Sequence, residues 1–159
     1  MRPLAAVPEP EGDPLIQLCA FFVGDEEFAI DIMRVDEILQ PRKPTPVPGA
    51  PSFVEGVLNL RGSILPVINL RQRLRSAAPT VRRKPKLVVC WLGRRRIALA
   101  VDGIAGVVRE HLSDVKPPPP VVLAGRRPCI VGVTGGAERL RLLLDLRAVL
   151  SGGMNEEMG

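Results

Sequence analysis

The chain has 159 residues, a formal net charge of +5 and an aromatic content of only 3%. A chain of this length buries roughly 68–70% of its unfolded surface, which suits one domain or two small subdomains that pack closely. Val, Ile and Leu must build the core, and together with 15 glycines and 17 prolines they favour many short strands over long helices. No apolar run approaches the roughly 20 residues of a membrane-spanning helix, and no signal-peptide pattern opens the chain, so we expect a cytoplasmic protein.

The first half of the chain predicts a tail, a hairpin and a connector. Residues 1–14 carry four prolines and several acidic residues, which predicts a disordered or loosely docked tail. We then expect a strand at residues 15–23, a turn at 24–27 and a returning strand at 28–32. A helical turn that leads into extended chain follows at residues 32–38, and a proline-rich connector at 41–51. Residues 51–55 are a candidate short helix.

The central stretch predicts a second hairpin. Residues 57–60 and 64–68 are apolar and β-prone, and Arg61-Gly62-Ser63 lies between them. Alternation along a strand places Asn59 and Arg61 on one face, a face with no evident intramolecular partner. Pro66 cannot donate to a ladder, which predicts an edge strand or a bulge there. Residues 70–76 are expected to leave this hairpin as a short helix.

The second half repeats the first. After a basic join at residues 77–85, residues 86–109 align without a gap with residues 17–40, and residues 132–150 align with residues 56–74. The repeat predicts hairpins at residues 86–101 and 129–146, with an extended run at 104–109 and a polyproline connector at 117–120 between them. A final helical turn is predicted at residues 146–150. Asn59, Arg61 and Glu37 have no polar counterpart in the second copy that matches them, so they are candidates for a function of one copy alone.

The residues that usually carry catalysis or metal binding do not form a recognisable pattern. The three cysteines, Cys19, Cys90 and Cys129, are odd in number and lack Cys-x-x-Cys spacing, which favours buried, reduced thiols. The one histidine, His111, is expected in a solvated loop, and nothing supports a triad with Ser113 and Asp145. No catalytic, cofactor-binding or metal-binding residue is therefore assigned, and a binding module is favoured over an enzyme.

Basic residues gather at residues 82–84, 94–96 and 126–127. A nucleic-acid surface would combine such clusters with stacking aromatics or an entering helix, and neither is visible in the sequence. Solvated charge or docking to an acidic protein is the favoured interpretation, and a basic β-barrel that binds nucleic acid stays open as an alternative of a different class.

These residues resemble the CheW family, the coupling proteins of bacterial chemosensory arrays. The similarity covers about residues 15–150, between the tail at 1–14 and a flexible tail at 151–159. It divides into subdomains at about 15–80 and 84–150, which can exchange edge strands with each other. The matching motifs are Gly24-Asp-Glu-Glu27, the following run to Ile38, Pro51-Ser-Phe-Val-Glu-Gly-Val-Leu-Asn-Leu-Arg-Gly62, Leu65-Pro-Val-Ile-Asn-Leu-Arg71, Ile97-Ala-Leu-Ala-Val-Asp-Gly-Ile104 and Val115-Lys-Pro-Pro-Pro119.

The resemblance implies a mainly β fold of two packed, five-stranded SH3-like barrels related by internal duplication, with a few short helices. It implies a non-enzymatic adaptor without cofactors that bridges the cytoplasmic tip of a methyl-accepting chemoreceptor to the regulatory domain of a CheA-type histidine kinase. That kinase domain resembles the family itself, so contacts between CheW-like domains in rings are implied as well. Nucleic acid is not an expected partner, and membrane contact is expected only through receptors.

The resemblance also implies which residues bind partners. Val35, Glu37, Gly56 and Arg61 fall where the family places residues needed for kinase or receptor contact, and Asn59 joins them as a residue of the first copy alone. An alternative is a scaffold that binds receptors without coupling to a kinase.

Two features depart from the family pattern. The family usually has Asp where Asn69 stands, which changes a charge near the partner surface, and residues 82–84 and 94–96 are unusually basic. Both departures suggest a specialised pathway, such as one that serves motility or development.

Overall fold

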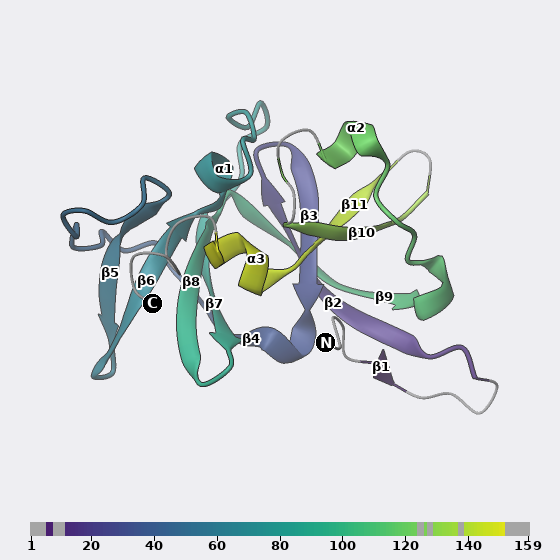
Figure 1. Ribbon diagram of the computed structural model, residues 1–159, viewed down its shortest axis with the longest axis horizontal. Helices are drawn as coiled ribbons and strands as arrows, with labels where there is room; N and C mark the ends of the chain where they lie inside the picture. Colours follow the sequence, from purple (N-terminus) through teal and green to yellow (C-terminus); the bar gives the residue numbers. More distant parts are fainter. Residues whose placement is uncertain (1–5, 8–11, 124–125, 127–128, 137–138, 152–159) are drawn as a thin grey trace.

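The computed structural model describes residues 6–7, 12–123, 126, 129–136 and 139–151. It is mainly β, with a few short helices (Figure 1). Its strands are β1 (Ala6–Val7), β2 (Leu15–Val23), β3 (Glu26–Asp31), β4 (Val35–Leu39), β5 (Val54–Leu60), β6 (Ser63–Asn69), β7 (Lys86–Leu92), β8 (Arg95–Val101), β9 (Gly103–His111), β10 (Ile130–Thr134) and β11 (Arg141–Leu144). Its helices are the 3-10 turns η1 (Ile32–Arg34) and η2 (Leu112–Asp114) and the short α-helices α1 (Leu70–Arg73), α2 (Pro120–Leu123) and α3 (Leu146–Ser151).

The strands form two sheets, and each sheet takes strands from both halves of the sequence (Figure 1). The first sheet has the order β1-β2-β3-β11-β10, and β9 also pairs with β2. The second sheet has the order β4-β7-β8-β6-β5. The β2–β3 hairpin thus pairs with β9 and β11 of the second copy, and the β7–β8 hairpin pairs with β4 and β6 of the first. The exchange is reciprocal and involves whole hairpins rather than edge strands alone.

The connector behind each edge strand closes each sheet into a barrel. Thr45 follows β4 and exchanges two backbone hydrogen bonds of 2.9 Å with Val57 on β5, at the opposite end of the strand order. Lys116 makes the equivalent 2.9 Å pair with Val133 on β10. We call these the first barrel (β2, β3, β9, β10, β11) and the second barrel (β4, β5, β6, β7, β8).

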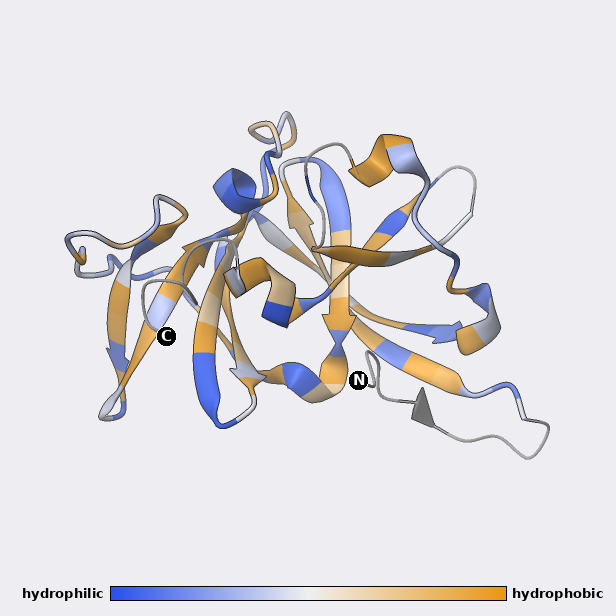
Figure 2. Cartoon of the chain, viewed as in Figure 1, coloured by the Kyte–Doolittle hydropathy of each residue, from blue (hydrophilic) through white to orange (hydrophobic). Residues whose placement is uncertain are grey.

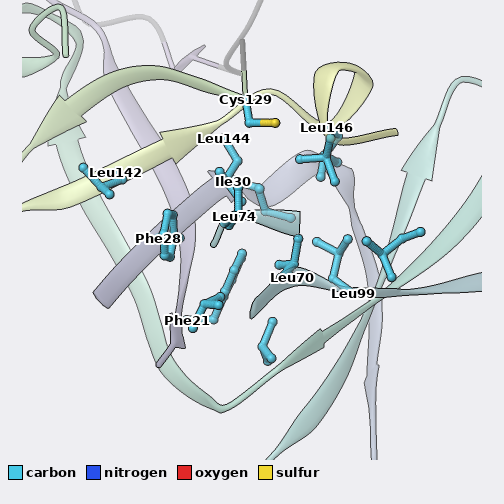
Figure 3. Packing of buried hydrophobic residues seen from close by; sticks show 14 of the residues in the cluster. Phe21, Phe28, Ile30, Leu70, Leu74, Leu99, Cys129, Leu142, Leu144 and Leu146 are labelled. Carbon is cyan, nitrogen blue, oxygen red and sulfur yellow. The ribbon is translucent and has the colours of Figure 1, made fainter. Parts of the chain in front are cut away.

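The core lies largely between the barrels, because the central strands bury both of their faces. Alternate residues of β2 face opposite sides, so Phe21 joins the shared core while Leu18 lies inside the first barrel. Phe28 and Leu99 belong to the same shared core as Phe21, where side chains from both sheets gather (Figure 3). A fully buried side chain of this kind stabilises the fold by about 1.5–3 kcal/mol, so this cluster fixes how the barrels sit on each other.

The hydropathy pattern follows this layout (Figure 2). Apolar residues run along the strands, and hydrophilic residues gather at the lower end of the β7–β8 hairpin, where the arginines of residues 94–96 stand. Within the described residues, no helix combines the length and apolar character needed to cross a bilayer.

Most predicted elements are confirmed, and two predictions are wrong. Pro66 lies neither on an edge strand nor at a bulge, because β6 stands between β5 and β8 and the β5–β6 register shifts elsewhere; Pro66 precedes the first residue of β6 that pairs with β8. The helical turn and extended run after β3 are η1 and β4, and the helical exit of the central hairpin is α1. Residues 51–55 form no helix: the amide of Val54 donates to Pro51, and the carbonyl of Phe53 accepts from Asn69, so a turn leads directly into β5. Within the predicted N-terminal tail, residues 6–7 form β1 on β2, and the predicted C-terminal tail beyond Ser151 lies outside the described residues.

Candidate partner-binding site

All five residues predicted to bind partners lie on or next to β4 and β5, where the second barrel closes; we call this part of the barrel the seam. Val35 and Glu37 are on β4, Gly56 and Asn59 are on β5, and Arg61 is in the turn after β5. The strands β4 and β5 are the two ends of the sheet order, and the connector after β4 pairs with β5 where the barrel closes. The fold therefore gathers residues that stand more than twenty positions apart into one surface.

Arg61 and Glu37 form an ion pair across this seam. Arg61 Nη2 donates to Glu37 Oε2, and the side chains are 63% and 27% exposed. The hydrogen bond to Glu37 and the negative charge of that carboxylate raise the pKa of Arg61. The prediction that Arg61 has no evident intramolecular partner is therefore wrong, because Glu37 binds it. Most of the guanidinium still faces solvent, where carboxylates of another protein can reach it.

The backbone holds Arg61 in an unusual conformation. Leu60 pairs with Ser63, so Arg61 and Gly62 are the two central residues of a tight hairpin turn, with φ of 49° and 87°. Positive φ at both positions is the signature of a type I′ turn, which prefers Asn, Asp or Gly. A left-handed residue with a Cβ costs roughly 1 kcal/mol or more, so the arginine side chain stands at a position where the fold alone would favour another residue.

The side chain of Asn59 stabilises this turn. Its Oδ1 accepts a 2.9 Å hydrogen bond from the backbone amide of Gly62. This role was not predicted from the sequence, and the contact makes Asn59 a positioning residue for Arg61 as well as an exposed polar group.

Gly56 allows the connector to reach β5. A Cβ placed on Gly56 would lie 2.3 Å from the carbonyl oxygen of Thr45, and its φ of 152° is one that residues with a side chain rarely adopt. The strand register shifts between Val54 and Gly56, which marks a bulge. Gly56 thus shapes the seam that carries Arg61.

Val35 lies on β4 at the seam and also packs against the core. It is half-buried, packs against the core between the barrels, and pairs with Cys90 on β7. The register shifts between Val35 and Glu37, so Asp36 is the extra residue of a bulge. Asp36 accepts a 3.1 Å hydrogen bond from Arg96, a contact that sequence reasoning missed because it depends on how β4 pairs with β7.

The second barrel and the turn before it also expose large apolar side chains. Ile38 on β4 and Ile64 on β6 are exposed, and Met33 of η1 is largely exposed as well. The sequence reading placed Ile38 in the core or a groove wall, but on this edge strand it shares the solvent side with Asp36. Its alternation with the charged residue was the signal that could have revealed this exposure.

Asn69 has a local role that explains its residue type. Its Oδ1 accepts from the amide of Gln72 at 3.0 Å and caps α1, while its Nδ2 donates to Glu55 at 3.2 Å. An aspartate would keep the cap but place a second carboxylate beside Glu55. The departure from the family pattern therefore matches a neighbouring charge.

Several residues of the basic clusters bind carboxylates of the same chain. Arg83 lies 3.4 Å from Asp25, Arg96 binds Asp36, and Arg126 binds Glu26 through a pair of nitrogens at 2.7 and 2.5 Å. These contacts occupy guanidinium groups that a nucleic-acid surface would need. Of the predicted third cluster, Arg127 lies outside the described residues.

The groups considered for redox or catalytic chemistry are placed in structural roles. Cys19, Cys90 and Cys129 are buried and reduced, and burial raises the pKa of all three thiols. His111 ends β9 rather than standing in a loop, with Nδ1 3.4 Å from Asp13. Asp145 accepts from the amide of Arg147 at 3.0 Å at the start of α3.

Comparisons with known proteins agree with this architecture. The family model of the CheW-like domain matches residues 17–153. Chemotaxis protein CheW of Rhizobium meliloti is 36% identical over 135 residues, which cover 84% of this chain and 86% of that protein. Chemotaxis protein CheW of Klebsiella aerogenes is 31% identical over 159 residues, with 99% and 94% covered. Protein FrzA of Myxococcus xanthus is 32% identical over 118 residues, with 74% and 71% covered.

A solved structure shares the fold. The crystal structure of the scaffolding protein TtCheW from Thermoanaerobacter tengcongensis matches with a TM-score of 0.77 at 24% identity, and the match covers 87% of this chain and 94% of that one. The mainly β fold of two SH3-like barrels is thereby confirmed. The chain belongs to the CheW family of chemotaxis proteins.

Proposed function

We propose that this protein couples chemoreceptors to a CheA-type histidine kinase in the cytoplasm, with Arg61 as the anchor of the coupling surface. The observation that carries the proposal is the position of Arg61. Its side chain is 63% exposed, is oriented by Glu37, and stands in a turn conformation that disfavours residues with a Cβ. Positive φ alone does not single out Arg61, because Arg75 shares it; its combination with the ion pair to Glu37 supports selection for function rather than for stability.

The second barrel offers the features of a protein-binding surface. Arginine is enriched among residues that dominate binding energy, and the same barrel exposes the apolar side chains of Ile38 and Ile64. Glu37 orients the guanidinium, Asn59 fixes the turn, Gly56 allows the seam to close, and Val35 connects the surface to the core. We assign the receptor tip and the kinase regulatory domain as the partners of this surface, with ring contacts between CheW-like domains as a third contact.

Co-sedimentation tests the proposal directly. Membranes that carry a methyl-accepting chemoreceptor are mixed with the protein, with and without a CheA-type kinase, and both pellets are quantified. We expect the protein to pellet with the receptors and to increase the amount of kinase in the pellet. If the protein pellets with the receptors but does not increase the amount of kinase in the pellet, the receptor-only scaffold is supported. Absence of the protein from the pellet would contradict the proposal.

The nucleic-acid alternative has a separate readout. Three arginines of the basic clusters already bind Asp25, Asp36 or Glu26, which leaves less free positive charge than the sequence suggested. A gel-shift with mixed RNA and DNA at low salt measures what remains. We expect no defined complex, whereas a salt-sensitive shift would favour this alternative.

A further inference from the structure

A groove opens in the second barrel where two parallel strands separate. β6 and β8 pair from Val67 and Ala98 to Asn69 and Ala100, and toward their turns the β5–β6 and β7–β8 hairpins diverge (Figure 1). The space between them has a volume of about 480 Å³. Residues 63–66, 94–97, Trp91 and Leu150 line it.

The groove combines an apolar wall with an arginine rim. Ile64 is 63% exposed and Trp91 is 38% exposed, which is unusual for such large apolar side chains. Arg96 is occupied, since it binds Asp36 and lies 5.4 Å from the centre of the Trp91 ring. Arg94 and Arg95 are exposed, and no carboxylate among the described residues lies within ion-pair distance of either. The groove therefore fits a peptide that carries both apolar and acidic side chains.

Residues 152–159 carry this combination of side chains. Leu150 of α3 lines the groove, and the residues after α3 read Gly152-Gly-Met-Asn-Glu-Glu-Met-Gly159. Met154 and Met158 flank two adjacent glutamates, Glu156 and Glu157. Eight residues of extended chain span at most about 26–29 Å, which is ample because Leu150, two residues before the segment, lines the groove.

We propose that residues 152–159 dock into this groove, with the methionines against Ile64 and Trp91 and the glutamates beside Arg94 and Arg95. Methionine is unbranched, adapts to irregular apolar surfaces and makes favourable contacts with aromatic rings. Two carboxylates match the two guanidinium groups that lack a partner among the described residues. The contact covers the facing edges of β6 and β8, which are templates for pairing with another chain.

The single tryptophan provides the test. Trp91 lies in the groove, so quenching of its fluorescence by acrylamide, a neutral quencher, reports whether the segment covers it. We compare the full-length protein with the variant E156K/E157K. The variant E9K/E11K makes the same change in net charge elsewhere and is the matched control. We expect E156K/E157K to lose the protection of Trp91 and E9K/E11K to retain it.

A charge exchange separates docking from an indirect effect. The variant R94E/R95E is expected to lose protection as well, and combining it with E156K/E157K is expected to restore it. Equal quenching of the native protein and E156K/E157K, or no restoration in the combined variant, would overturn the proposal. A dilution series with light scattering addresses docking between copies: protection that fades on dilution together with loss of a dimer would also overturn docking within one chain.

Discussion

Glu27 and Arg141 face each other on the parallel strands β3 and β11, with Arg141 Nε 2.5 Å from Glu27 Oε2. They are 114 positions apart and come from different halves of the chain. Arg141 also donates to Glu110 on β9 at 2.8 Å, so one guanidinium binds carboxylates on two strands of the first barrel, β3 and β9. The pair therefore fixes the exchange of hairpins between the halves.

Arg141→Met is expected to destabilise the protein strongly. Glu27 is only 5% exposed, and removing its main partner leaves a buried charge, which costs about 3–5 kcal/mol. Urea unfolding measures the loss. Arg139→Met is the matched control, because Arg139 also lies 3.2 Å from Glu27 but is 70% exposed, and exposed ion pairs contribute about 1 kcal/mol or less. Equal losses in the two variants would contradict this role of Arg141.

Gly56→Ala is expected to cost about 2–3 kcal/mol in the free energy of unfolding, because the new Cβ meets backbone that is fixed at the barrel seam. Its repeat counterpart Gly132 tests the reason. A Cβ there meets the side chain of Val115 at 3.0 Å, with no restriction from positive φ, so Gly132→Ala is expected to cost less. A smaller loss for Gly56→Ala than for Gly132→Ala would refute the close approach to Thr45.

Substitutions at Arg61 are expected to reveal the strain of its turn. Arg61→Gly and Arg61→Ala both remove the ion pair, but glycine adopts positive φ freely, so the glycine variant is expected to be about 1 kcal/mol more stable than the alanine variant. Arg94 occupies the second position of the β7–β8 turn, beside Gly93, and is not at positive φ. There the order is expected to reverse. The same order at both positions in chemical denaturation would argue against strain at Arg61.

The stability of the fold is expected to fall in alkaline solution through its thiols. Burial raises the pKa of Cys19, Cys90 and Cys129 above the ordinary 9.0, so the folded state keeps protons that the unfolded state releases. This contribution is complete below pH 9.0 and is lost as the pH rises above it. The variant C19A/C90A/C129A is expected to show a shallower decline in urea unfolding between neutral pH and about pH 10. An unchanged slope would contradict the prediction.

The sequence predicted the local elements well because each follows from nearby residues. The apolar runs and turn glycines placed β2, β7 and both hairpins of each copy close to their observed bounds. The candidate helix at residues 51–55 failed because Phe53 is drawn into the core, where tertiary contact outweighs local preference. Duplication indicated two barrels, but the repeat pattern is the same whether a hairpin pairs within its own copy or with the other.

The site was predicted as a set of residues rather than as a geometry. Arg61 and Asn59 stood out because the second copy lacks them, and Glu37 for the same reason. Their contacts depend on closure of the second barrel, which joins β4 to β5 through Thr45 and Val57. Side-chain alternation along one strand carries no information about that closure, so the ion pair with Glu37 was not foreseen.

Binding of the Arg61→Ala variant to receptor and kinase tests the central claim most directly. Arg75→Ala is the matched control, since Arg75 is also an exposed arginine at positive φ, 54°, but lies away from the seam, after α1. We expect both variants to fold, and Arg61→Ala alone to weaken capture of at least one partner by about 30-fold, the equivalent of about 2 kcal/mol. A folded Arg61→Ala protein that binds both partners as tightly as the Arg75→Ala protein would contradict the account.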